Sequence, residues 1–159
     1  MKHTISVIVE NKPGVLHRVS GLFSRRGFNI ESLAVGTTEN PNISRMTIVV
    51  EGDEIVLEQI TKQLYKLIDT LKIFDLPEQK LIERELALIK VHANDKTRQE
   101  ITQIVDIFKA KIVDVAEDSL TIEISAEKDK VDNVQKLLEK FGIQELVRTG
   151  KIALQRGGI

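Results

Sequence analysis

The spacing of apolar residues along this chain changes from a strand period to a helix period in the same order twice. Residues 4–10 alternate, with Ile5, Val7 and Val9 on one face, as in a half-buried strand. From Val15 the spacing becomes helical, and Gly27 is placed to end that helix. Because both halves alternate strands and helices in this way, few architectures remain open to the chain.

The first half contains four strand patterns and two helix patterns. Two strands are expected at residues 30–38 and 43–51, joined by turn-forming residues at 39–42, and a last strand is expected at 70–76. Asp53 is placed to cap the second helix. The order of elements in this half is therefore β-α-β-β-α-β.

The second half repeats this order. Its expected strands are 86–91, 111–116, 120–125 and 143–149, and its expected helices run through 101–108 and 131–141. The segment 77–84 is charged and lacks clear alternation, so we place a boundary there. We predict an α+β protein of two ferredoxin-like domains, residues 1–76 and 77–159, each an antiparallel sheet with helices on one face.

Charge and cysteine content narrow the expected partners and location. The 23 basic and 24 acidic side chains give a net charge of −1, so no overall field draws the chain to nucleic acid or to an anionic membrane. No cysteine is present, which excludes disulfides and thiolate metal sites and is compatible with a reducing cytoplasm. The N-terminal residues lack a signal-peptide pattern and a membrane-length apolar run. We expect a soluble cytoplasmic protein.

No arrangement of residues typical of an enzyme is found. The three histidines are scattered, and the chain has no Walker sequence, nucleophile elbow or paired carboxylates set apart as acid and base. We therefore expect neither catalytic residues nor a metal site. RNA binding by this fold uses aromatic side chains on the central strands. The expected strands offer aliphatic residues and methionine instead, at Ile5, Val7, Val9, Met46, Ile48 and Val50.

A Pro-Gly pair precedes the first helix, where Ser, Thr or Asp would be the better cap. Pro13 presets φ for a first helical turn, and Gly14 allows a ligand to approach the backbone closely. The free amides of Gly14, Val15 and Leu16 would then suit a carboxylate or a phosphate. The alternative is that Pro-Gly only makes the turn, and spacing alone does not decide between the two.

The second strand of the first half is expected at a sheet edge. Leu33 and Val35 make this edge apolar, which invites pairing with a second copy of the chain. Asn29, just before Ile30, would then approach the loop from Asn11 to Leu16 of the partner. Such a pocket would offer amides to a carboxylate, asparagine oxygens to an ammonium group and an apolar wall to a small side chain. We interpret it as an amino-acid site.

The stretch NKPGVLHRVSGLFSRRGFNIESLAVG, residues 11–36, resembles the N-terminal ACT domain of the small regulatory subunit of acetolactate synthase. Length and element order fit that family along the whole chain, although residues 77–159 match in layout more than in motif. The resemblance implies a noncatalytic subunit in branched-chain amino acid biosynthesis. Such a subunit binds the catalytic large subunit, raises its activity and makes it sensitive to allosteric feedback inhibition by valine.

The resemblance also implies where the effector and the cofactors lie. In that family valine sits at the interface of an ACT homodimer. The matching positions here are Asn11, Gly14, Val15 and Leu16 from one protomer, with Asn29 and Ile30 from the other. Thiamine diphosphate, Mg and FAD are expected in the catalytic partner, and no cofactor is expected in this chain.

Two other functions remain open. The chain could be a free-standing ACT-type amino-acid sensor that regulates another target. It could also have an acylphosphatase-like activity, because that fold uses a loop of amides before its first helix together with an arginine and an asparagine. Arg18 and Asn42 would take those roles.

Overall fold

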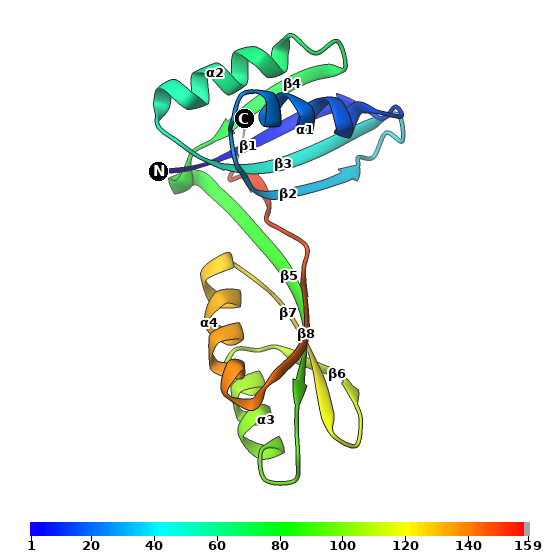
Figure 1. Ribbon diagram of the computed structural model, residues 1–159, viewed down its shortest axis with the longest axis vertical. Helices are drawn as coiled ribbons and strands as arrows, with labels where there is room; N and C mark the ends of the chain where they lie inside the picture. The colour runs from blue at the N-terminus through cyan, green and yellow to red at the C-terminus, as the bar shows by residue number, and fades with distance from the viewer. Residues whose placement is uncertain (158–159) are drawn as a thin grey trace. The chain divides into compact units, whose positions relative to one another are not determined.

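The structure, a computed structural model, describes residues 1–157 and divides into two compact units (Figure 1). The first unit contains Met1–Ile82 together with the described residues from Lys151 onward, and the second contains Glu83–Gly150. Gly158 and Ile159, the end of the expected second domain, lie outside the described residues. The chain thus leaves the first unit once and returns to it. Whether residues 1–76 fold on their own stays a prediction.

The first unit is a four-stranded antiparallel sheet with two helices. The strands follow the order β2-β3-β1-β4, which places β2 and β4 at the edges. The elements are β1 (Lys2–Glu10), α1 (Val15–Arg25), β2 (Ile30–Thr37), β3 (Ile43–Glu51), α2 (Glu54–Tyr65) and β4 (Thr70–Leu76).

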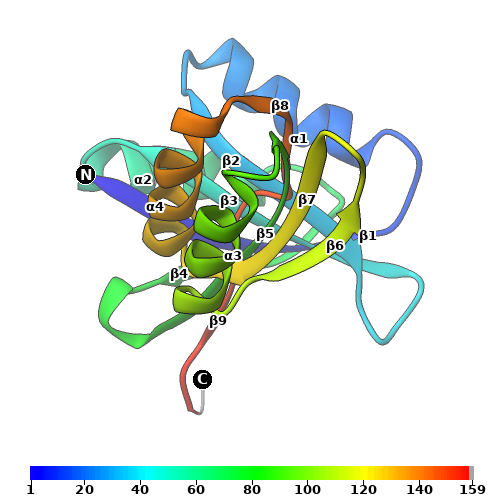
Figure 2. The same cartoon turned by 90° about the horizontal axis from the view of Figure 1, so that it is seen from below.

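The second unit has the same topology, with strand order β6-β7-β5-β8. Helices α3 and α4 lie on one face of its sheet (Figure 2). The elements are β5 (Leu81–His92), α3 (Arg98–Ile107), β6 (Lys111–Val115), β7 (Ser119–Ala126), α4 (Lys128–Leu138) and β8 (Ile143–Arg148), with short 3-10 helices η1 (Glu78–Lys80) and η2 (Glu139–Phe141). The prediction of two ferredoxin-like βαββαβ units is confirmed.

Helix boundaries follow the predicted signals. The carboxylate of Asp53 accepts a hydrogen bond of 2.9 Å from the amide of Val56 and so caps α2. Gly27, with φ 72°, lies in the left-handed region just beyond α1, and Phe28 donates to the carbonyl of Phe23 over 3.0 Å. These local contacts depend on neighbouring residues only, and the sequence therefore predicts them well.

Two segments differ from the sequence analysis. The segment 77–84, which shows no clear alternation in the sequence, contains η1 and the start of β5 at Leu81. After β8 a further strand, β9 (Ile152–Gln155), pairs with β5. A four-residue strand is too short to show a period, and its partner lies far away in the sequence. Only the tertiary pairing reveals it.

The alternation in β5 also hides which face is buried. Ala87, Ile89 and Val91 point into the core and are fully buried, whereas Leu86 and Leu88 are 36% and 37% exposed on the opposite face. Both sets are apolar, so alternation cannot distinguish the inner from the outer set.

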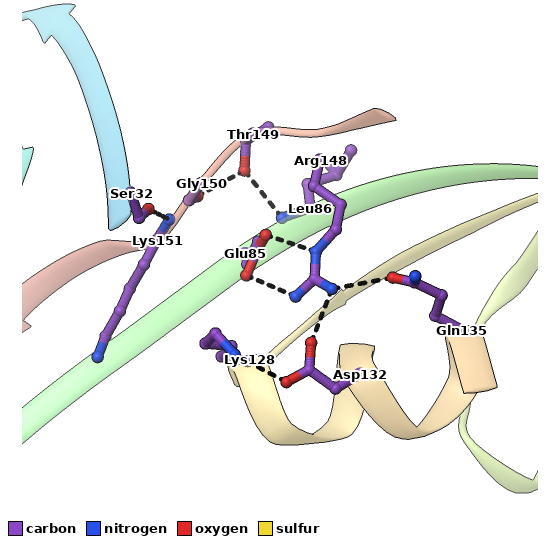
Figure 3. Close-up of polar contacts among 10 residues, drawn as sticks. All are labelled: Ser32, Glu85, Leu86, Lys128, Asp132, Gln135, Arg148, Thr149, Gly150 and Lys151. Atoms are coloured by element: carbon purple, nitrogen blue, oxygen red, sulfur yellow. Dashed lines mark hydrogen bonds and ion pairs between the residues drawn. The ribbon is translucent and has the colours of Figure 1, made fainter. Parts of the chain in front are cut away.

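A network around Arg148 ties β5, β8 and α4 together within the second unit (Figure 3). Its Nε and Nη2 atoms donate to the two carboxylate oxygens of Glu85 over 2.7 and 3.0 Å. Its Nη1 atom donates to Asp132 over 2.7 Å and to Gln135 over 3.0 Å. Lys128 donates to the other oxygen of Asp132 over 2.8 Å. The bidentate pair is the geometry in which arginine binds carboxylate most strongly.

This network gives the second unit a predictable dependence on pH. Partial burial pushes the pKa of Asp132 up, but hydrogen bonds and charge attraction from Lys128 and Arg148 together outweigh it and leave that pKa lowered. A carboxylate with a folded pKa below its unfolded value of about 3.9 stabilises the fold above that value. This stability is lost as the pH falls through the folded pKa.

We therefore expect Asp132→Asn to flatten the acid side of the stability curve. Urea unfolding of the full chain at pH 7 and near pH 3, followed by circular dichroism, measures the difference. The exposed Asp129, three residues earlier on α4, is changed to asparagine as the matched control. An equal acid dependence in the two variants would contradict the role given to Asp132.

Candidate functional site

The Pro-Gly pair forms a type II turn ahead of α1. The amide of Val15 donates to the carbonyl of Lys12 over 3.3 Å, and Gly14 lies at φ 86° and ψ −6°, the values of the third residue in such a turn. We expected Pro13 to lie in the first turn of the helix. The helix begins only at Val15, so Pro13 lies in the preceding β-turn instead. The turn by itself accounts for both residue types.

The turn leaves fewer free amides than predicted. The Val15 amide closes the turn, so the expectation that it is free is wrong. Within residues 1–157, the amides of Gly14 and Leu16 donate no hydrogen bond to the protein, which leaves them available to an acceptor. Both residues are exposed, Leu16 by 43%.

Asn11 holds this loop to the hairpin between β2 and β3. Its side-chain nitrogen donates to the carbonyl of Pro41 over 2.9 Å, and its amide donates to the carbonyl of Asn42 over 2.8 Å. Its side-chain oxygen accepts no hydrogen bond within the described part of the chain. Asn11 is therefore positioned by its donors and retains one free acceptor.

Arg18 and Asp69 form an ion pair that the sequence did not reveal. The Nε atom of Arg18 donates to one oxygen of Asp69 over 2.8 Å, and Nη2 forms an ion pair with the same oxygen at 2.7 Å. The Asp69 side chain is only 7% exposed. The Asp69 carbonyl also accepts from the amide of Glu10 over 2.9 Å. A Cβ atom added at Gly14 would lie 2.9 Å from Nη1 of Arg18. The ion pair thus connects the first turn of α1 to the residue that precedes β4.

This ion pair bears on the acylphosphatase-like reading. Two donors of Arg18 are already committed to a buried carboxylate, which neutralises the charge a phosphate would need. The amide of Asn42 donates to the side-chain oxygen of Asn40 over 3.0 Å in a local turn. The geometry therefore favours a structural role for Arg18, and the Asn42 backbone forms part of the hairpin turn.

Asn29 and Ile30 lie at the other end of the same sheet from Asn11. Val50 of β3 is opposite both Ile30 and His3, whereas Thr37 and Val9 are both opposite Ser44. The start of β2 is thus aligned with the start of β1, and the end of β2 with the loop before α1. One chain cannot bring the six predicted site residues together.

The two edges of the first sheet differ in their protection. On β4, the Tyr65 hydroxyl accepts a hydrogen bond of 3.2 Å from the amide of Ile73 and so occupies a donor of that edge. On β2, the register with Met46 turns Val35 toward the helix side of the sheet, where it is 48% exposed. The apolar and less protected edge is therefore β2.

The strand residues expected to decide RNA binding do not face solvent. Ile5, Val7, Val9, Met46, Ile48 and Val50 are all buried in the helix-covered core, so RNA would have to bind the other face of the sheet. The opposite face carries one aromatic side chain, Phe74, on β4. Lys72 Nζ lies 4.7 Å from its ring centroid and Arg45 Cζ lies 5.8 Å from it. A cationic surface therefore exists there that the sequence analysis missed, because it depends on pairing between distant strands.

No group of three or more metal-binding side chains gathers within residues 1–157. None of the helices described there has the length and apolar content needed to span a membrane.

Similarity to known proteins extends over nearly the whole chain. Residues 5–72 match the family model described as the AHAS small subunit-like ACT domain, and residues 84–157 match the model described as the small subunit of acetolactate synthase. A probable acetolactate synthase small subunit of Archaeoglobus fulgidus is 59% identical over 99% of this chain and 98% of its own length.

Two further relatives agree. The acetolactate synthase small subunit of Mycolicibacterium smegmatis is 54% identical over 98% of this chain and 91% of its own. The crystal structure of the acetolactate synthase small subunit from Thermotoga maritima superposes with a TM-score of 0.94 at 43% identity, covering 100% of this chain and 99% of that chain.

Proposed function

Since this chain belongs to the family of acetolactate synthase small subunits, we propose that it is the cytoplasmic, noncatalytic regulatory subunit of that enzyme. In this proposal the chain binds the catalytic large subunit, raises its activity and transmits feedback inhibition by valine in branched-chain amino acid biosynthesis. Thiamine diphosphate, Mg and FAD belong to the large subunit. The first unit is the ACT domain and the sensor.

The observation that carries the valine site is the separation of its two halves. Asn29 and Ile30 lie at one end of β2, and the Asn11–Leu16 loop lies at the other end of the sheet. If β2 pairs antiparallel with β2 of a second copy, the start of one strand comes beside the end of the other. Asn29 and Ile30 of the partner protomer would then face the loop. The site is complete only in a homodimer.

The chemistry of the two halves suits a small zwitterion. The amides of Gly14 and Leu16 would bind the carboxylate, and the side-chain oxygens of Asn11 and of the partner's Asn29 would bind the ammonium group. Leu16 and Ile30 would form an apolar wall for the side chain of the effector, whereas the side chain of Val15, the other predicted contact, is buried in the core and only 4% exposed. The exposed Val35 on the same edge adds to this wall.

Typical magnitudes place the affinity in a sensing range. A carboxylate at a helix N-terminus gains about 0.3–2 kcal/mol, and burial of a valine side chain adds about 1.5–3 kcal/mol. Hydrogen bonds to the ammonium group contribute further, against the cost of immobilising the ligand. Dissociation constants in the micromolar to millimolar range follow, which suit a metabolite sensor.

Val35→Lys is expected to weaken dimer formation at least tenfold, because pairing of two β2 strands would bring two added charges together. Sedimentation equilibrium measures the association. Leu71→Lys on β4 is the matched control, since Leu71 and Val35 are both 48% exposed. Equal dimerisation in the two variants would assign the interface to another surface.

The direct test of the proposed function is reconstitution. The purified chain is mixed with an acetolactate synthase catalytic subunit, and turnover is measured with and without valine. We expect higher turnover on addition of the chain and inhibition by valine only in its presence. A catalytic subunit that neither binds nor responds would favour the alternative, a free-standing ACT-type sensor of another target.

A further inference from the structure

The helix-free face of the first sheet is covered at one end and open at the other. Strand register orders this face into rows that cross β2, β3, β1 and β4. The first row is mostly buried, the middle row is partly buried, and the last row is the most open. They are Ser32-Val49-Thr4-Leu76, then Ala34-Thr47-Ser6-Phe74, then Gly36-Arg45-Ile8-Lys72.

The C-terminal segment of the first unit contributes to the cover over the first row. The amide of Lys151 donates to the Ser32 hydroxyl over 2.9 Å, and Ala153 of β9 is only 6% exposed. Val49 and Leu76 in that row are each 4% exposed. In the last row Gly36 and Lys72 are exposed and Arg45 is half-buried. The exposure of this face to solvent therefore increases toward the end of the sheet that carries the Asn11–Leu16 loop.

Two cations lie around one aromatic ring at the open end of this face. Arg45 and Lys72 both lie over the Phe74 ring, and neither forms an ion pair with a carboxylate within residues 1–157. Glu10 follows Ile8 on the same face of β1, but it pairs with Lys12 over 3.0 Å. Two like charges gathered around one ring repel each other, and a carboxylate placed between them would remove that repulsion.

One nitrogen of the Arg45 side chain also lacks a hydrogen-bond partner within the described residues. Its Nε–H is shielded from solvent and has no acceptor within the described residues. A shielded donor without an acceptor is unfavourable. Burial also lowers the pKa of the Arg45 guanidinium, which means that its surroundings disfavour the charge that a carboxylate would favour.

We propose that this cationic surface, formed by Arg45, Lys72 and Phe74, binds an acidic segment of the acetolactate synthase catalytic subunit. The inference rests on the proposed function and adds the docking surface to it. The surface lies at the end of the sheet that carries the effector loop, but on the opposite face. A partner bound there would contact β1 and β3, the strands that connect to this loop and to the Pro41 hairpin.

An acidic protein segment fits this surface better than RNA. Base stacking by such a sheet uses aromatic rings on the two central strands. Here the central strands show Ser6 and Ile8 on β1 and Thr47 and Arg45 on β3, while the single ring of Phe74 lies on the edge strand β4. Arginine on an aromatic face, next to a lysine, instead suits a carboxylate that approaches from solvent.

The test uses the full chain carrying Arg45→Glu and Lys72→Glu. We expect its affinity for the purified catalytic subunit, measured by surface plasmon resonance, to fall at least tenfold, and activation at equal concentration to be lost. Valine binding to the free small subunit, measured by titration calorimetry, should change less than twofold. Wild-type affinity for the catalytic subunit should fall with added salt more steeply than that of the variant.

Two further variants keep the test decisive. Arg45→Met with Lys72→Met removes both charges but retains aliphatic stems over Phe74, so it reports on docking even if the glutamate variant fails to fold. We expect weaker binding and a reduced salt dependence. Lys66→Glu with Lys96→Glu is the control, because both lysines are exposed, form no ion pair within the described residues and give the same change in net charge.

Several outcomes would overturn the inference. If the methionine variant bound the catalytic subunit with the affinity of the control, Arg45 and Lys72 would not contribute to docking. If that methionine variant still conferred inhibition by valine, the proposed function would stand without the docking surface. Loss of self-association in the charge-removal variants would make the surface an interface between copies. Wild-type binding to a uridine oligonucleotide that the variants lose, with catalytic-subunit binding unchanged, would assign it to RNA. A wild type that binds no catalytic subunit would overturn both proposals.

Discussion

Gly14→Asp is expected to weaken feedback inhibition strongly while leaving assembly with the catalytic subunit intact. The new carboxylate would occupy the space above the Gly14 and Leu16 amides, where we propose that the carboxylate of valine binds. Like-charge repulsion and the loss of the amide contacts should raise the valine concentration for half-inhibition about 100-fold, which corresponds to roughly 2.7 kcal/mol. Turnover of the reconstituted enzyme against valine concentration measures the shift.

A control must separate charge from backbone strain at this position. Gly14 has φ 86°, and a Cβ atom there would lie 2.9 Å from Nη1 of Arg18, so any side chain strains the turn. Gly14→Ala carries that strain, roughly 1–2 kcal/mol, without the charge. We expect it to lower stability but to retain much of the valine response. Equal valine sensitivity in the wild type and in Gly14→Asp would refute the site.

Arg148→Met is expected to destabilise the second unit by about 2–4 kcal/mol. The substitution leaves the Glu85 carboxylate, whose side chain is 7% exposed, without its bidentate partner. Removing one member of a buried ion pair costs about 3–5 kcal/mol, and the 20% exposure of Arg148 places this pair toward the lower end. Urea unfolding of the full chain, followed by circular dichroism, measures the loss.

The same two strands supply the matched control. Lys90 of β5 pairs with Glu145 of β8 over 2.8 Å on the surface, so Lys90→Met removes an ion pair between the same strands without burying a charge. It should leave stability nearly unchanged. Glu85→Gln combined with Arg148→Met should recover part of the loss. A single Arg148→Met variant as stable as the Lys90→Met control would show that Glu85 does not need this partner.

The fold was predictable wherever the determinants are local. Asp53 caps α2 and Gly27 ends α1 through contacts with residues no more than three to five positions away. Element order follows from the change between strand and helix periods, and the chirality of the chain leaves few ways to pack that order. The inner face of β5 was not predictable, because Leu86 and Leu88 are as apolar as the residues that are buried.

The candidate site was predictable only in part. Pro13 and Gly14 mark the turn in the sequence, but the loss of the Val15 amide to Lys12 depends on the turn type. Arg18 and Asp69 are 51 positions apart in the sequence, and no local pattern predicts that they pair. The cationic surface arises in the same way, because Arg45 and Phe74 come together only when β3, β1 and β4 are aligned in register.

Two βαββαβ units and the turn ahead of the first helix were predictable from the chain, since apolar period, caps and turn residues act over a few positions. Three features arise only in the folded protein: β9 returns to the first unit, Asn29 lies at the opposite end of the sheet from Gly14, and Arg45 and Lys72 lie around one ring. These facts depend on strand register. Register is set by how whole faces pack together, and no short stretch of sequence contains that information.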